Sequence, residues 1–131
     1  MKEHCTEIRV RYGETDQMGF VYYGAYATYF EVARVELLRA CGVTYKNLET
    51  NGILMPVTQY EIQYIRPARY DDLLKVNTAV ESLTAARIRF KYDIHIAQTK
   101  ICEATTTLAF LNAKTMRPMK CPELLSEMFS R

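Results

Sequence analysis

The segment from Tyr23 to Cys41 constrains the fold more than any other part of this sequence. It holds no proline and only one glycine, and Gly42 follows it as a helix stop, so a long helix is predicted here. Of the seventeen positions from Ala25 to Cys41, twelve are apolar or aromatic. A surface helix would carry a wider charged face, so we expect this helix to be buried on most sides. The rest of the chain must therefore cover it.

Alternation of apolar and polar residues with a period of two predicts the strands that cover the helix. In residues 87–96, five apolar or aromatic residues alternate with charged residues and a histidine. Alternation of this kind predicts strands over residues 6–12, 57–65, 74–81, 87–96 and 101–111. One face of the last strand carries Cys102, Ala104, Thr106, Leu108 and Phe110. Such strands are typical of an antiparallel sheet with one face on the core.

These elements together predict an α+β fold, in which an antiparallel sheet of five or so strands wraps around a long central helix. A short helix over residues 122–129 is expected to follow the last strand. No internal repeat, low-complexity segment or linker divides the 131 residues. We therefore expect a single domain over residues 1–131.

Composition excludes several classes of function. Seventeen Lys and Arg against fifteen Asp and Glu give a net charge of +2, which is too balanced for a nucleic-acid partner to be expected. No apolar run approaches the roughly 20 residues of a membrane span, and the first residues do not resemble a signal peptide. The four cysteines lie far apart, which indicates reduced thiols in a cytoplasmic protein. With two histidines and no Cys/His pair at short spacing, no metal site is expected.

The loop at residues 13–19 leads directly into the predicted helix and carries Asp16. Free N–H groups at a helix start favour negative charge, and they can stabilise the oxyanion that forms when a thioester or ester carbonyl is attacked. A carboxylate beside a helix start is a minimal acyl-transfer site. An aspartate in a loop bounded by glycines is more often a turn former or helix cap, so the residues alone leave both interpretations open.

Two stretches of the sequence match a known pattern. The first contains Glu14-Thr15-Asp16, Gly19, Val21-Tyr22-Tyr23, Tyr26 and Phe30-Glu31-Val32-Ala33-Arg34, and the second is Tyr64-Ile65-Arg66-Pro67-Ala68-Arg69-Tyr70-Asp71-Asp72. They resemble the fingerprint of the hotdog-fold acyl-CoA thioesterases, specifically the branch of 4-hydroxybenzoyl-CoA thioesterase and YbgC-like proteins. The resemblance extends over about residues 6–112. It implies a hotdog fold and a homo-oligomer, either a dimer or a dimer of dimers (a homotetramer), with active sites completed between subunits.

The resemblance also implies an activity, the hydrolysis of acyl-CoA thioesters to a free carboxylic acid and coenzyme A. Asp16 would be the catalytic carboxylate, acting as a general base on water or as a nucleophile that forms a mixed anhydride. The backbone N–H groups near Tyr23 and Gly24 would polarise the thioester carbonyl, and Gly19 would make the turn that presents this segment. Coenzyme A enters as part of the substrate, so no separate cofactor is expected.

Further residues are candidates for contact with the substrate. Tyr26 is one of these candidates, and it is the last residue of the part of the first stretch that precedes Phe30. Glu31 lies where the hydroxybenzoyl enzymes carry an acid that recognises the substrate hydroxyl, or it pairs with an arginine such as Arg34 or one across the subunit contact. Guanidinium groups suit phosphate geometry, and five cations are candidates for the phosphates of coenzyme A: Arg66, Arg69, Arg87, Arg89 and Lys91.

Two departures from the family pattern keep other functions open. Many YbgC-like members have His where this chain has Tyr23, and the family usually has Asn where this chain has Ala25. The second departure favours a non-catalytic module that binds acyl-CoA or acyl carrier protein, whereas the presence of Asp16 favours an enzyme. A hydratase or dehydratase would need a histidine base in this segment, and Tyr23 argues against it.

Overall fold

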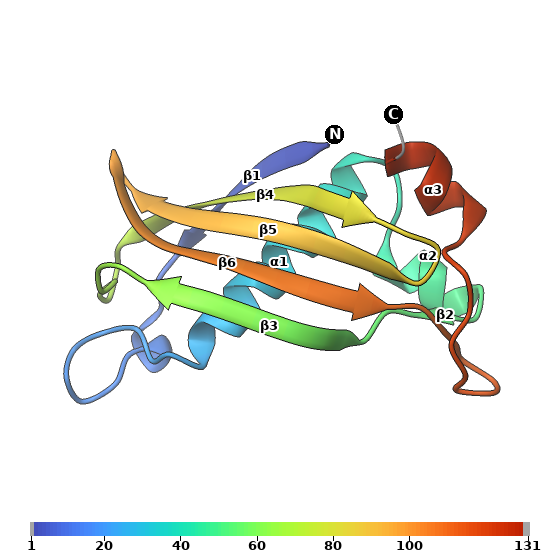
Figure 1. Ribbon diagram of the computed structural model, residues 1–131. Helices are drawn as coiled ribbons and strands as arrows, with labels where there is room; N and C mark the ends of the chain where they lie inside the picture. Colours follow the sequence, from blue (N-terminus) through green and yellow to red (C-terminus); the bar gives the residue numbers. More distant parts are fainter. Residues whose placement is uncertain (1, 130–131) are drawn as a thin grey trace.

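The computed structural model describes residues 2–129, and its main feature is a five-stranded antiparallel sheet with one long helix across a single face (Figure 1). The strand order is β1-β4-β5-β6-β3. The strands are β1 (Glu3–Arg9), β3 (Val57–Tyr64), β4 (Leu73–Leu83), β5 (Arg87–Ile96) and β6 (Thr99–Ala109). The predicted α+β architecture is confirmed. Of the domain predicted over 1–131, residues 1, 130 and 131 lie outside the described residues.

The long helix α1 (Ala25–Ala40) packs one face against the sheet. Its buried side chains include Tyr29, Phe30, Leu37 and Leu38, each almost fully removed from solvent. Burying a side chain of this size stabilises the fold by roughly 1.5–3 kcal/mol. The chain then leaves the helix at Gly42, whose φ of +94° favours glycine.

The expectation that α1 is buried on most sides is wrong for this chain. Ala27, Thr28, Glu31 and Val32 are exposed along the face that points away from the sheet. A five-stranded sheet covers one face of a helix, and the remaining described elements do not extend over the other. The apolar residues on that face therefore remain open.

The predicted strands are confirmed, with shifts at their ends. The first strand is found at Glu3–Arg9 rather than 6–12, because the backbone N–H of Val10 already donates to the carbonyl of Asp72 (2.9 Å) and a 3-10 turn, η1 (Tyr12–Glu14), follows. The C-terminal helix α3 (Glu123–Phe129) is found as predicted. Three short elements were not anticipated: α2 (Tyr45–Thr50), β2 (Ile53–Leu54) and β7 (Leu111–Asn112).

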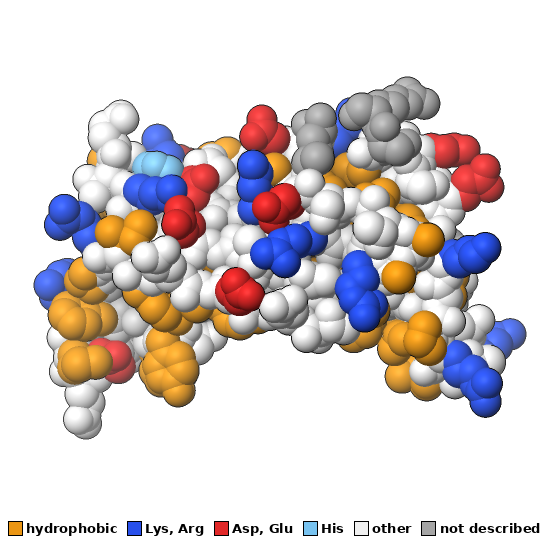
Figure 2. Space-filling view, viewed as in Figure 1, with side chains coloured by type: hydrophobic (Ala, Val, Ile, Leu, Met, Phe, Trp, Pro, Cys, Tyr) orange, Lys and Arg blue, Asp and Glu red, His pale blue; other side chains and the backbone are white. Residues whose placement is uncertain are grey.

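The two faces of the sheet differ as the alternation predicts. The residues predicted on one face of the last strand are all buried: Cys102, Ala104, Thr106, Leu108 and Phe110. The opposite, outer face carries a mixture of positive and negative side chains (Figure 2). None of the described helices has the length and apolarity that crossing a membrane requires.

Strand β3 forms one edge of the sheet. It pairs with β6 on one side, and no other strand in the described part of the chain pairs with its second side. Nearly all its residues are exposed, including Val57, Tyr60 and Tyr64. This edge lies beside the loop that leads into α1 (Figure 1).

Candidate active site

The loop before α1 is a tight reversal with Asp16 at its base. Thr15 and Val21 form an isolated antiparallel bridge. Inside it, the N–H of Asp16 donates to the carbonyl of Phe20 (2.8 Å), and the N–H of Gly19 donates to the carbonyl of Asp16 (3.0 Å). The φ of Gly19 is +83°, a conformation that favours glycine. The structure thus places Gly19 in the turn for which the sequence proposed it.

The carboxylate of Asp16 has one oxygen committed to the loop. Oδ1 accepts hydrogen bonds from the N–H of Met18 (2.9 Å) and the N–H of Phe20 (3.3 Å). Asp16 therefore does form the turn, as the more frequent interpretation predicted. Its second oxygen, Oδ2, has no hydrogen-bond partner among residues 2–129, and Asp16 also lines a cavity. The turn-forming role leaves one oxygen available for chemistry.

That cavity, of about 420 Å³, lies between the loop, the start of α1 and the end of β3. Its lining is mostly apolar and aromatic, with Asp16 and Arg66 as the charged members. The other lining residues are Met18, Phe20, Val21, Tyr23, Tyr26, Tyr64, Ile65 and Pro67. Hydrophobic side chains gather on this end of the molecule in the space-filling view (Figure 2). An apolar pocket with a few polar groups is typical of a small-molecule site.

The start of α1 leaves backbone donors open beside this cavity. Gly24, at the N-cap position, makes no side-chain cap, and the N–H of Ala25 donates to the carbonyl of Tyr22 (2.9 Å). The N–H groups of Tyr23 and Gly24 have no acceptor in the described part of the chain. A side chain at position 24 would put its Cβ 2.6 Å from Cε2 of Tyr22. The close approach of the Tyr22 ring depends on this glycine.

Two hydrogen-bonded contacts hold these parts together. The hydroxyl of Tyr64 donates to the carbonyl of Tyr23 (3.2 Å), which links β3 to the helix start. Glu14 accepts from the backbone N–H and the Nε of Arg11 (both 2.9 Å) and from the hydroxyl of Tyr29 (2.8 Å). Burial opposes the charge of Glu14, but these hydrogen bonds outweigh it and hold the pKa of its carboxyl below the usual value. The loop is thereby tied to the buried face of α1.

Among the remaining predicted residues, Tyr26 and Arg66 join Asp16 in the cavity. Burial raises the pKa of Tyr26 to about 12, so its hydroxyl is neutral and available as a donor. Arg69 is nearby but holds its guanidinium 4.8 Å above the ring of Phe20.

Arg87 and Arg89 are not brought to this cavity. They lie on the outer face near the start of β5, whereas the cavity is near the other end, where Ile94 pairs with Cys102 and Cys102 with Tyr64. Seven residues of strand span about 23 Å. Arg89 is also paired with Glu81, Nε to Oε2, at 2.8 Å. Their contact with a substrate stays a prediction.

Glu31 lies in a second cavity along α1, together with Arg34. Within residues 2–129 these two side chains form no ion pair at 4.0 Å or less, so the pairing considered from the sequence is not found inside the described chain. Sequence reasoning missed the burial of Arg34. A single arginine in an amphipathic helix gives no signal of it.

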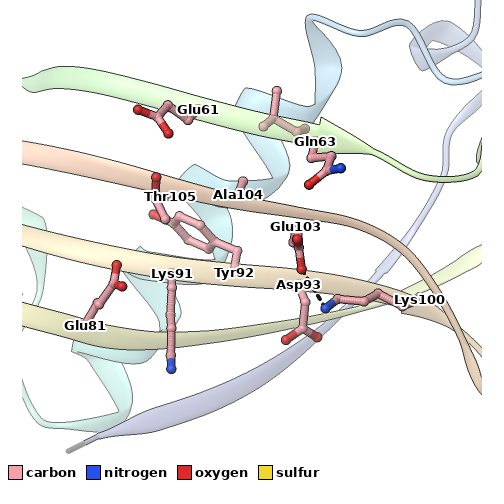
Figure 3. Close-up of a pocket in the computed structure, with 11 residues that line it drawn as sticks. Glu61, Gln63, Glu81, Lys91, Tyr92, Asp93, Lys100, Glu103, Ala104 and Thr105 are labelled. Carbon is pink, nitrogen blue, oxygen red and sulfur yellow. Dashed lines mark ion pairs between the residues drawn. The ribbon is translucent and has the colours of Figure 1, made fainter.

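A third hollow lies on the outer face of the sheet (Figure 3). Its charged residues come from β3, β5, β6 and β4, and Lys100 points to Glu103 with a nitrogen–oxygen distance of 2.6 Å. Neither Asp16 nor the start of α1 contributes to it. It is therefore separate from the candidate site.

Several known proteins that are similar to this chain are thioesterases. A family model described as thioesterase-like superfamily matches residues 10–129. The acyl-CoA thioesterase YbgC of Haemophilus influenzae is 32% identical over 123 residues, which cover 93% of this chain and 90% of that protein. A DHNA-CoA thioesterase from Staphylococcus aureus has a TM-score of 0.89 and 35% identity, with 99% of this chain and 85% of that chain covered. A hypothetical protein from Thermus thermophilus has a TM-score of 0.92 and 32% identity, with 98% and 95% covered. These structural neighbours and the helix-on-sheet architecture confirm the expected hotdog fold.

Proposed function

The chain belongs to the thioesterase-like superfamily, and we propose that this enzyme hydrolyses acyl-CoA thioesters through Asp16 and the uncapped start of α1. One observation carries the proposal: Asp16, whose Oδ2 has no hydrogen-bond partner among the described residues, lines an apolar cavity whose wall includes Tyr23, beside backbone N–H groups that find no acceptor in the same part of the chain. The apolar lining suits an acyl group, and the carboxylate suits the activation of water or direct attack on a carbonyl.

The reaction consumes one water molecule. In the general-base route, Asp16 Oδ2 takes a proton from water while the water oxygen attacks the thioester carbon. The N–H groups of Tyr23 and Gly24 then hold the oxyanion. As the tetrahedral intermediate collapses, the C–S bond breaks and the proton passes to the sulfur of coenzyme A. The products are the carboxylic acid and the free thiol.

The nucleophilic route uses the same atoms. Asp16 Oδ2 attacks the carbonyl carbon and coenzyme A leaves as its thiolate. Water then hydrolyses the mixed anhydride, which returns the carboxylate of Asp16 and releases the proton that converts the thiolate to the thiol. Both routes need the oxygen of Asp16 that does not hold the loop. Neither route, as proposed, uses a separate cofactor, because coenzyme A enters as part of the substrate.

The remaining assignments follow from position. Tyr26 contributes a neutral phenol and Arg66 a guanidinium to the cavity that holds Asp16, so Arg66 is our first candidate for an anionic part of coenzyme A or of an acyl carrier protein. Gly19 shapes the loop.

The free state of all four cysteines agrees with the cytoplasmic location that we propose from their spacing.

We propose that the enzyme works as a homo-oligomer built on the open edge of β3. An unpaired edge with exposed apolar side chains is a template for pairing with another strand. A second copy that added its own β3 would extend the sheet and cover the exposed side of α1. The candidate cavity lies at the end of the same edge, so the partner would complete it.

The decisive comparison is between the wild type and Asp16→Asn, by thiol release from a panel of acyl-CoA thioesters. The asparagine oxygen can still accept the two loop hydrogen bonds, so folding is preserved. We expect the rate to fall by about 100-fold or more. Asp71→Asn is the matched control, since Asp71 lies on an exposed turn outside the cavity. A wild type that binds acyl-CoA and hydrolyses none of the panel would favour the binding module, and equal rates in both proteins would remove Asp16 from the mechanism.

A further inference from the structure

A second cavity, of about 230 Å³, lies between α1 and β3. From α1 it is lined by Ala27, Thr28, Glu31 and Arg34, and Tyr60 faces them from β3. It is smaller than the cavity at Asp16. No step of the proposed hydrolysis uses it.

Arg34 is the unusual member of this cavity. Its exposure is 8%, and its Nε donates to the hydroxyl of Tyr45 (3.1 Å). Within residues 2–129 no carboxylate lies within 4.0 Å of its guanidinium. Burial opposes the charge, but the phenol oxygens of Tyr45 and Tyr92 keep the pKa of Arg34 above its usual value. The helix thus holds a buried cation that no carboxylate among residues 2–129 neutralises by an ion pair.

A buried charge without a counter-charge is costly, and an incoming anion would recover part of that cost. Three residues that carry hydroxyl groups also line the cavity: Thr28, Tyr60 and Thr106. The hydroxyl of Thr106 is held by Tyr92 at 2.6 Å. Burial raises the pKa of Tyr60, which keeps its hydroxyl protonated. The lining of the cavity therefore combines the guanidinium of Arg34 with side chains that carry neutral hydroxyl groups.

Glu31 is the one carboxylate in the lining, and it is exposed. Its oxygens lie beyond ion-pair distance from Arg34. An anion bound at Arg34 would be attracted by the adjacent buried guanidinium. It would be repelled by the more distant carboxylate of Glu31, and water screens that repulsion. The balance favours an anion bound to Arg34.

The position of this cavity relates it to Asp16. Gly24, Ala27, Thr28 and Glu31 follow one another along the exposed stripe of α1, and Arg34 lies ten residues beyond Gly24. Ten residues of helix rise about 15 Å, and helical side chains lean towards the N-terminus. An acyl group whose carbonyl is bound at the helix start would run along this stripe, and its far end would reach the guanidinium.

We propose that Arg34 determines specificity by binding an anionic oxygen at the far end of the acyl group, so that the enzyme prefers acyl chains ending in a carboxylate. This inference rests on the proposed function for the placement of the thioester carbonyl at the helix start. It assigns to Arg34 a direct contact with substrate that leaves the hydrolytic step to Asp16.

The test uses thioether analogues of coenzyme A, which cannot be hydrolysed, with binding measured by calorimetry. Hexyl-CoA and 5-carboxypentyl-CoA form the matched pair. For the wild type we expect the carboxylated analogue to bind at least tenfold more tightly. Arg34→Gln should abolish this preference and Arg34→Lys should retain part of it. Arg39→Gln is the control, because Arg39 lies on the same helix but is exposed and paired with Glu36 (3.0 Å).

Equal binding of the two analogues by the wild type would overturn the inference, even if Arg34→Gln failed to fold. A preference unchanged in Arg34→Gln would also overturn it. So would a wild type that discriminates 4-hydroxyphenacyl-CoA from phenacyl-CoA more strongly than it discriminates 5-carboxypentyl-CoA from hexyl-CoA, because the protein would then select a hydroxyl group rather than a carboxylate. Thiol release from hexanoyl-CoA and adipoyl-CoA separates this result from the proposed function. Preferential binding of the carboxylated analogue without hydrolysis would contradict the proposed function and support the role of Arg34. Hydrolysis of both thioesters without a binding preference would support the proposed function and contradict the role of Arg34.

Discussion

The hydroxyl of Tyr29, on the buried face of α1, donates a 2.8 Å hydrogen bond to Oε1 of Glu14, two residues before Asp16. The same carboxylate accepts from Arg11, and the carbonyl of Glu14 accepts from the N–H of Tyr22 (2.8 Å). Glu14 therefore joins both sides of the loop to the helix. The carboxylate of Glu14 is therefore one of the groups that fix the position of Asp16 relative to the helix start.

The first prediction concerns pH and Glu14→Gln. The pKa of Glu14 is lower in the folded state than in the unfolded state, where it is about 4.3. The charge of Glu14 therefore stabilises the fold at pH values above the unfolded-state pKa, and this contribution is lost as the pH falls through the folded-state pKa. At pH 7 we expect the free energy of unfolding of Glu14→Gln to be about 1–2 kcal/mol lower than that of the wild type, because the variant loses hydrogen bonds to a charged group. Urea unfolding from pH 7 to pH 3 should show the two proteins converge. Glu49→Gln, at an exposed carboxylate on α2, should show no such difference, and a gap that widened towards acid would contradict the assignment.

A second prediction concerns Gly24→Ala. The added Cβ would lie 2.6 Å from the Tyr22 ring, so the ring must move across the start of α1. We expect kcat/KM for acyl-CoA hydrolysis to fall about tenfold, or about 1.4 kcal/mol, while thermal stability is preserved. Gly13→Ala is the matched control, because nothing lies within 4 Å of a Cβ there. Truncating the ring in the double variant Tyr22→Ala/Gly24→Ala should restore part of the activity, and no recovery would mean that the ring is not the cause.

The third prediction tests the open edge of β3 with Ile62→Pro. The N–H of Ile65 donates to Ile101, so alternation in an antiparallel pair directs the N–H of Ile62 towards the open edge. Proline there leaves the pairing with β6 in place and removes a donor from the edge. We expect sedimentation velocity to show an oligomer for the wild type and for Ile62→Val, and a monomer with little hydrolytic activity for Ile62→Pro. A monomeric, fully active wild type would refute the shared site.

Most of the fold could be predicted from the sequence because its main elements have clear periodicities. The alternation in residues 87–96 corresponds directly to β5, and the segment without proline before Gly42 corresponds to α1. The short helix α2 was missed because six residues are too few for a periodic signal. Its one local sign is Thr44, whose hydroxyl accepts from the N–H of Asn47 (3.0 Å) and caps the helix.

The candidate site was only partly predictable for a different reason. Asp16 and Tyr23 are close in sequence, so a motif can join them, and Tyr26 follows in the first turn of α1. The surroundings of Arg34 depend on Tyr45, Tyr92 and Thr106, which come from three other elements. No spacing in the sequence brings these residues together. The burial of an arginine is decided by the packing of α1 on the sheet.

The two oxygens of Asp16 have an evolutionary consequence. One secures the loop and the other remains free for chemistry, so exchanging a single atom, oxygen for an amide nitrogen, separates the two properties. On the proposed mechanism, a descendant with asparagine at this position would inherit the loop, the cavity and the open helix start without the means to activate water. The step from an enzyme to a carrier or sensor of acyl groups is then one codon change that does not pass through an unfolded intermediate, and the same step can be reversed.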